Sequence, residues 1–171
     1  MNNSFREAIK LNKGAAVVMA GSTSDRQHID KVVSSLEEYK IPYEVRIFSA
    51  HKQPGATEVV VREYNDVGGS LAFVGIAGGV DALSGVLGFH ALGLVISSPP
   101  DGRNESCLGN PKGSSNAYVE KPVNVGRVIA QAYAGINPRF RELLKDEMGD
   151  KICSLETSDE DFLEEYGRTE Y

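Results

Sequence analysis

Three short segments of the sequence carry side chains that could do chemistry. They are Gly21-Ser22-Thr23-Ser24-Asp25, then Ser49-Ala50-His51-Lys52, and residues 77–85, which are rich in glycine. Hydroxyl-bearing residues at a helix start favour a phosphate, because free backbone N–H groups and the positive end of the helix dipole meet there. An imidazole exchanges protons near neutral pH, and a neighbouring lysine attracts a phosphate as a point charge. These residue types are typical of a site for a phosphorylated small molecule.

Each segment also has a plain structural explanation. The first could be an ordinary turn with a Ser or Asp helix cap, which is a common arrangement. His51 alone could be structural, and His28 and His90, which fall within predicted helices, are expected to have structural or surface roles. The glycines of the third segment let a backbone approach a ligand closely, but they match neither the dinucleotide fingerprint nor the P-loop.

The three segments follow predicted strands. Short apolar runs indicate buried parallel strands over residues 14–20, 43–48, 71–76 and 93–98. Helical spacing of apolar residues, with Ser24 placed to cap the first helix, predicts helices over residues 25–36, 55–65, 82–92, 121–134 and 137–148. This alternation predicts an α/β fold, a three-layer doubly wound parallel sheet of the flavodoxin-like kind with an additional C-terminal helical segment. In such a sheet the three segments should meet in one crevice at the carboxyl ends of the strands.

The charge of the chain is concentrated at its end. The 171 residues carry a formal net charge of −6, and residues 149–171 hold eight acids and two bases, which account for all of it. We therefore expect a single domain over residues 1–148 and an acidic, partly disordered tail over residues 149–171. A neutral body without a basic stripe is not expected to bind nucleic acid, and no apolar run approaches the ~20 residues of a membrane span.

The two cysteines, Cys107 and Cys153, have neither metal-ligand nor redox-motif spacing. The N-terminus has no apolar stretch behind basic residues, as a secretory leader would have. A cytoplasmic protein without a metal site is the expectation.

With the three segments in order, the sequence resembles the PurE family, the aminoimidazole ribonucleotide carboxylases and N5-carboxyaminoimidazole ribonucleotide mutases of purine biosynthesis. The family has G-S-x-S-D in its first loop, S-A-H-[RK] in its second and A-G at the start of its third. All three occur here. The resemblance covers residues 15–147, including Ser97-Ser98-Pro99-Pro100, Pro111-x-Gly113 and Pro122.

The resemblance implies a carboxylation at carbon that uses no cofactor and no metal, with His51 as the catalytic proton carrier. It implies that Ser22, Ser24, Ser49 and Lys52 bind the phosphate of the ribonucleotide, that Asp25 binds the ribose, and that Gly21 and Ala50 also bind the substrate. The site for the base and CO2 would be lined by Ala77, Gly78, Ala82 and Leu83, with Gly79 and Asp81 as further substrate-binding residues. The amides around Gly78 and Gly79 would stabilise the new carboxylate. Its implied partners are a ribonucleotide, CO2 and other copies of the chain in a homo-octamer.

Two positions place the sequence nearer to the carboxylase branch of the family. Lys52 matches that branch, and Ala82 stands where the mutase branch has a histidine. However, Gly79-Val80-Asp81 replaces the Arg-Ser-Asn of the carboxylases, and Gly109-Asn110 replaces their Arg-Met. Two alternatives therefore stay open: a mutase or diverged enzyme acting on another ribonucleotide, and a non-catalytic nucleotide-binding or flavodoxin-like module.

Overall fold

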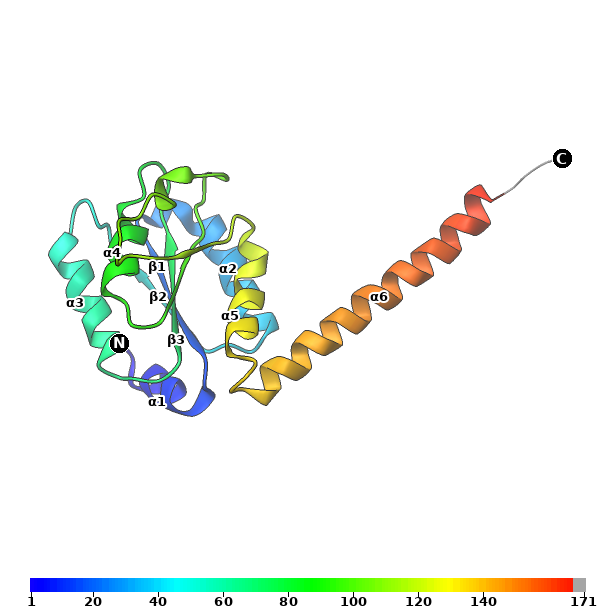
Figure 1. The fold of residues 1–171 in the computed structure, drawn as a ribbon, viewed down its shortest axis with the longest axis horizontal. Coiled ribbons are helices and arrows are strands. Elements are labelled where there is room, and N and C mark those ends of the chain that lie inside the picture. The colour runs from blue at the N-terminus through cyan, green and yellow to red at the C-terminus, as the bar shows by residue number, and fades with distance from the viewer. Residues whose placement is uncertain (168–171) are drawn as a thin grey trace.

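A single five-stranded sheet forms the centre of the molecule in the computed structural model, which describes residues 1–167. All strands are parallel, and their order is β2-β1-β3-β4-β5 (Figure 1). The strands are β1 Ala15–Ala20, β2 Tyr43–Ile47, β3 Leu71–Ile76, β4 Leu94–Ser97 and β5 Ala117–Tyr118. The predicted doubly wound, flavodoxin-like fold is confirmed. The short strand β5 was not predicted.

Helices cover both faces of the sheet. They are α1 Asn3–Asn12, α2 Arg26–Glu38, α3 Pro54–Asn65, α4 Ala82–His90, α5 Val125–Tyr133 and α6 Pro138–Tyr166, with short 3-10 turns at Thr23–Asp25, Glu105–Cys107 and Pro122–Asn124. Helices α2 and α5 lie on one face, whereas α3 and α4 lie on the other (Figure 1). No helix of residues 1–167 combines the length and the hydropathy needed to cross a bilayer.

The side chains of β1 and β3 alternate between two separate apolar cores. On β1, Ala16 and Val18 pack among α2 and α5, whereas Val17 and Met19 pack among α1, α3 and α4. All six residues of each of these strands are buried. A central parallel strand needs an apolar residue at every position for this reason, since neither of its faces meets water.

Helix α2 begins differently from the prediction. A 3-10 turn over Thr23–Asp25 precedes it, and Ser22 rather than Ser24 provides the cap, accepting a hydrogen bond from the Ser24 N–H at 3.1 Å. Asp25 stands at the helix N-cap position but makes no capping hydrogen bond with its side chain. The tighter turn leaves the hydroxyl groups of the first segment at the end of β1.

Helix α5 packs directly on the backbone of α2 at Gly126. A Cβ at this position would lie 2.0 Å from the carbonyl oxygen of Ser35. The Gly126 N–H also donates to Ser35 Oγ at 3.0 Å, and Ser35 Oγ donates to the Val32 carbonyl at 2.8 Å. The absence of a side chain on Gly126 thus allows α5 to pack closely against α2 on this face of the sheet.

The C-terminal helix is longer than predicted. We expected a helix that ends near Met148, followed by a partly disordered acidic tail, but α6 continues to Tyr166. Asn137 and Pro138 begin it as predicted, with the Asn137 side chain accepting from the Arg139 N–H at 3.2 Å. The last four residues of the expected tail, 168–171, lie outside the described residues.

Polar contacts fix the direction in which α6 leaves the body. Its Glu147 carboxylate accepts hydrogen bonds from the Tyr39 hydroxyl of α2 and from the Arg127 guanidinium of α5. Burial and the contact with Glu147 raise the pKa of Tyr39 to about 12, so Tyr39 stays a donor at any physiological pH. Beyond this point the helix projects away from the sheet (Figure 1).

Candidate functional site

A pocket of about 320 Å³ lies at the carboxyl ends of β1, β2 and β3, and the three chemical segments meet there. It is lined by Gly21, Ser22, Ser24, Asp25, Ser49, Ala50, His51, Lys52, Ala77, Gly78, Val80, Ala82 and Leu83. Every residue implied by the resemblance is in this lining except Gly79 and Asp81, while Val80 lines the pocket without having been predicted. Topology therefore brings together residues that lie more than 60 positions apart.

The first loop is held by the sheet and by its own hydroxyl groups. The Gly21 N–H donates to the Ile76 carbonyl, at the end of β3, at 2.9 Å. This hydrogen bond joins the start of the first loop to the start of the third. Ser22 Oγ accepts from both the N–H and the hydroxyl of Ser24, at 3.1 and 2.8 Å. The hydroxyl hydrogen of Ser22 is thus left to point toward an acceptor in the pocket.

The second loop turns sharply around Ser49. The Ser49 carbonyl accepts from the N–H groups of Lys52 and Gln53, at 3.2 and 2.7 Å. This turn places the exposed side chains of His51 and Lys52 at the pocket, just before α3. Asp25, His51 and Lys52 are the ionisable residues of the lining, and the imidazole of His51 is the candidate proton carrier among them.

The third loop is bound to the segment that follows β4. The Gly79 N–H donates to Asp101 Oδ2 at 2.8 Å, and the Gly79 carbonyl accepts from Asn104 Nδ2 at 2.8 Å. The resemblance implied that the amides around Gly78 and Gly79 meet the new carboxylate. The Gly79 N–H already donates to Asp101, and Gly79 does not line the pocket. Of this pair, only Gly78 is placed to meet the carboxylate.

Asp81 points into the protein and away from the pocket. Its carboxylate accepts from the Ser84 N–H at 2.8 Å and from the Ser84 hydroxyl at 2.5 Å, which makes it the cap of α4. Ser84 Oγ in turn accepts from Ser97 Oγ of β4 at 2.6 Å, and Ser97 Oγ accepts from Asn116 Nδ2 at 2.7 Å. The side chain of Asp81 is buried, and its charge faces donors of the α4 N-terminus.

His28 lies nearer to the site than the sequence indicated. Its Nε2 atom is 3.0 Å from Ser98 Oγ, at the end of β4, and burial lowers the pKa of His28. A neutral imidazole is favoured in this position. His28 does not line the pocket, and its contact with Ser98 connects α2 to the segment after β4.

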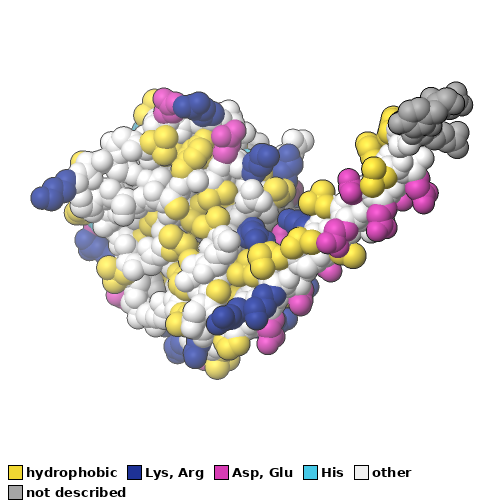
Figure 2. All heavy atoms as spheres, turned by 45° about the vertical axis from the view of Figure 1, so that its right-hand side comes forward, with side chains coloured by type: hydrophobic (Ala, Val, Ile, Leu, Met, Phe, Trp, Pro, Cys, Tyr) yellow, Lys and Arg dark blue, Asp and Glu magenta, His cyan; other side chains and the backbone are white. Residues whose placement is uncertain are grey.

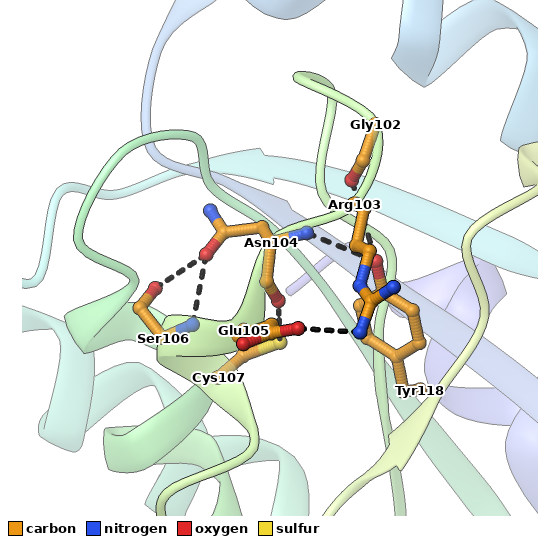
Figure 3. A network of polar contacts seen from close by, with 7 residues as sticks. All are labelled: Gly102, Arg103, Asn104, Glu105, Ser106, Cys107 and Tyr118. Atoms are coloured by element: carbon orange, nitrogen blue, oxygen red, sulfur yellow. Dashed lines mark hydrogen bonds and ion pairs between the residues drawn. The ribbon is translucent and has the colours of Figure 1, made fainter.

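Sequence reasoning overlooked the segment after β4 as a support of the site. Asn104 and Ser106 form a local turn in which Asn104 Oδ1 accepts from the Ser106 N–H at 3.0 Å (Figure 3). An Asn-x-Ser pattern after a predicted strand is a signal for such a turn. Nothing local reveals that its side chains reach Gly79, 25 residues earlier.

A larger hollow, of about 480 Å³, lies between α2 and α6. It is lined by Glu38, Tyr39, Leu143, Asp146, Glu147, Asp150, Lys151 and Ser154. Four carboxylates against one lysine make it a poor site for an anionic ligand. Within residues 1–167, no cluster of His, Cys, Asp or Glu side chains is arranged to hold a metal ion.

The family model for AIR carboxylase, that is aminoimidazole ribonucleotide carboxylase, matches residues 15–151. The chain belongs to the AIR carboxylase family. It is 30% identical over 138 residues to the phosphoribosylaminoimidazole carboxylase of Treponema denticola, which covers 77% of this chain and 87% of the relative. The crystal structure of Treponema denticola PurE superposes with a TM-score of 0.79 at 26% identity, covering 90% of this chain and 99% of that one.

Other relatives carry different names or are longer. A probable N5-carboxyaminoimidazole ribonucleotide mutase of Methanothermobacter thermautotrophicus is 33% identical over 142 residues, which is 78% of this chain and 42% of that protein. Of several animal relatives, which carry bifunctional or multifunctional names, the chain spans only 20% to 37% of the length.

The first two loops can be tested as a phosphate anchor. Ser22→Ala combined with Lys52→Ala is expected to weaken binding of the expected ribonucleotide by about 2 to 5 kcal/mol, since hydrogen bonds to charged groups contribute roughly 1.5 to 3 kcal/mol each. Titration calorimetry measures the affinity, and circular dichroism checks the fold because Ser22 is also a cap. Lys40→Ala, which removes a lysine outside the pocket, is the matched control. Unchanged affinity in the double variant would refute the anchor.

The role of Asp81 as a cap gives a second test. Asp81→Asn keeps an oxygen that accepts from the Ser84 N–H, so the carboxylation rate expected of this family should change by less than about threefold. Asp81→Ala removes the cap and should lower the free energy of unfolding by about 1 to 2 kcal/mol in urea denaturation. A rise in carboxylation of tenfold or more in Asp81→Asn would mean that Asp81 faces the ligand after all.

Proposed function

We propose that this protein joins CO2 to C4 of 5-aminoimidazole ribonucleotide to form the 4-carboxy product in purine biosynthesis. The observation that carries the proposal is the convergence of the three family loops on one pocket, with His51 beside Lys52. Membership of the AIR carboxylase family supports the reaction class.

The reaction needs little from the protein beyond positioning and proton transfer. The amino group of the imidazole makes C4 electron-rich, so C4 attacks the carbon of CO2. One C–C bond forms, while the π bond of one C=O of CO2 breaks and its electron pair moves to oxygen, which gives the carboxylate. The ring proton at C4 then leaves to the imidazole of His51, which restores the aromatic ring. Neither step requires a cofactor or a metal.

The lining of the pocket fits the parts of this substrate. Ser22, Ser24, Ser49 and Lys52 provide hydroxyl and ammonium donors for the phosphate. Asp25 is placed to accept hydrogen bonds from ribose hydroxyls. Ala77, Gly78, Val80, Ala82 and Leu83 form a mostly apolar end with small residues, which suits CO2 and the flat face of the base.

The carboxylase is favoured over the mutase by one position. Ala82 lines the pocket where the mutase branch of the family has a histidine. The shift of a carboxyl group from nitrogen to carbon would therefore proceed without that second imidazole. Among residues 1–167, His51 is the histidine that lines the pocket.

One assay separates the two activities. The protein is incubated with 5-aminoimidazole ribonucleotide and bicarbonate or CO2, or with the N5-carboxyamino precursor, and absorbance of the 4-carboxy product is followed. We expect product from the first mixture. Product from the precursor alone would identify a mutase, and a protein that is inactive in both mixtures but still binds the ribonucleotide would be a binding module.

We also propose that the protein assembles as a homo-octamer, as the resemblance to PurE enzymes implies. Figure 2 shows hydrophobic side chains along α6 on a helix that stands clear of the body. The exposed stripe consists of Met148, Ile152, Leu155, Phe162, Leu163 and Tyr166. Because α6 spans about 43 Å and projects outward, the core of its own chain does not cover this stripe, whereas other copies of the chain can. The cytoplasmic location and the lack of a nucleic-acid partner remain predictions from the sequence.

The assembly is tested by mass. Light scattering should report a particle near eight times the 18.5 kDa chain. Leu155→Glu combined with Phe162→Glu should yield smaller particles with an intact circular dichroism spectrum, since charges would enter an apolar contact. Glu164→Gln, on the opposite face of α6, should leave the mass unchanged. A wild-type protein that is a stable monomer would contradict this assembly.

The proton carrier is tested by His51→Asn. This change should lower kcat by roughly two to four orders of magnitude, the usual contribution of a positioned acid or base, because the amide cannot take the ring proton. Ribonucleotide affinity should stay within about threefold, since the phosphate contacts are untouched. His90→Asn is the control, because His90 lies at the end of α4 away from the pocket. A His51 variant with near wild-type turnover would exclude it from the mechanism.

A further inference from the structure

Three side chains of the segment after β4, here called the clasp, hold the third loop from outside the pocket. They are Asp101, Asn104 and Ser106. Asp101 Oδ2 accepts from the Gly79 N–H at 2.8 Å, and the Gly79 carbonyl accepts from Asn104 Nδ2 at 2.8 Å and from Ser106 Oγ at 3.1 Å. Ser106 Oγ also accepts from the Asp81 N–H at 2.9 Å. Side chains of a distant segment therefore satisfy both backbone polar groups of Gly79.

Packing alone does not determine the path of the loop at Gly79. The residue has a φ of +66°, and a Cβ added there would have no neighbour within 4 Å. Its position is thus left to hydrogen bonds. At Gly78, by contrast, an added Cβ would lie 3.3 Å from Asp101 Oδ2. The carboxylate of Asp101 therefore sits directly behind the glycine that lines the pocket.

The clasp is itself anchored to the fold, so it can act as a fixed support. Asn104 is buried, and its N–H donates to the Tyr118 hydroxyl of β5 at 3.1 Å. The Asn104 carbonyl accepts from the Cys107 thiol at 3.2 Å (Figure 3). The second oxygen of Asp101 lies 3.3 Å from Asn104 Nδ2. Asp101 as acceptor and Asn104 as donor thus hold the N–H and the carbonyl of Gly79 in place.

We infer that Asp101 is a positioning residue for carboxylation, because it fixes the Gly78–Gly79 turn that bounds the CO2 end of the pocket. The inference rests on the proposed function. Asp101 does not line the pocket, so its influence passes through the Gly79 N–H to Gly78. The phosphate end is formed by the first two loops, to which the clasp makes no hydrogen bond. Loss of Asp101 should therefore impair turnover and leave ribonucleotide affinity nearly unchanged.

The test compares Asp101→Ala with Asp101→Asn. Asp101→Ala removes the acceptor and should lower kcat by about 10- to 100-fold, as a shift of about 1 Å in a reacting group does. Asp101→Asn keeps one oxygen for the Gly79 N–H and should restore turnover to within about threefold. In both variants the KM for the ribonucleotide should stay within about twofold. Arg103→Ala is the matched control, since Arg103 pairs with Glu105 at 2.5 Å on the exposed side of the same segment.

A readout without substrate makes the inference independent of the assay. Hydrogen exchange of the Gly79 amide, followed by NMR, should be at least tenfold faster in Asp101→Ala than in the wild type, but unchanged in Asp101→Asn and Arg103→Ala. Unchanged exchange and turnover in Asp101→Ala would overturn the inference, as would an equal loss of turnover in Asp101→Asn. A wild-type protein without carboxylation would refute the proposed function, and the exchange rates would still decide whether Asp101 holds the loop.

Discussion

Burial of the two central strands on both faces is the constraint from which the rest of the structure follows. Since β1 and β3 expose no side chain to water, helices must cover the sheet above and below, and each parallel strand must be followed by a crossover. The crossovers leave the strands at the same edge. Short loops that contribute nothing to either core are thereby gathered at one place, where their residues are free to serve a ligand.

Local pattern was enough to predict the central strands and the loops that follow them, because both depend on residues close in sequence. Local pattern could not predict the contacts between segments that are distant in the sequence. Phe5 and Ile9 make α1 part of the core, yet the sequence around them is polar, and α1 was not among the predicted helices. The strand β5 has two residues, and it exists because Ala117 and Tyr118 pair with β4. Pairing of this kind has no periodicity to detect.

The tail after Met148 was wrongly predicted as partly disordered because it has few apolar residues, although the spacing of those residues indicates a helix. The segment after Met148 is acidic and has few apolar side chains, which is typical of disorder. Those few, however, fall on one side of a helix, because Ile152, Leu155, Phe162 and Tyr166 follow one another after three, seven and four residues. This is the spacing of one helix face. An acidic helix with such a stripe is more stable where the stripe is covered, as it would be in the proposed assembly of several copies.

The replacement of the carboxylase sequence Arg-Ser-Asn by Gly79-Val80-Asp81 need not change the chemistry of the pocket. It adds an aspartate, but Asp81 turns its carboxylate to the N-terminus of α4, where its charge meets the donors of Ser84. One carboxylate oxygen of Asp101 likewise accepts a hydrogen bond from the Gly79 N–H. Both negative charges are thus drawn to backbone donors outside the lining, so neither is aimed at a developing carboxylate. The shape of the third loop at Gly79 therefore depends on polar side chains of another segment, since the clasp binds both the N–H and the carbonyl of Gly79.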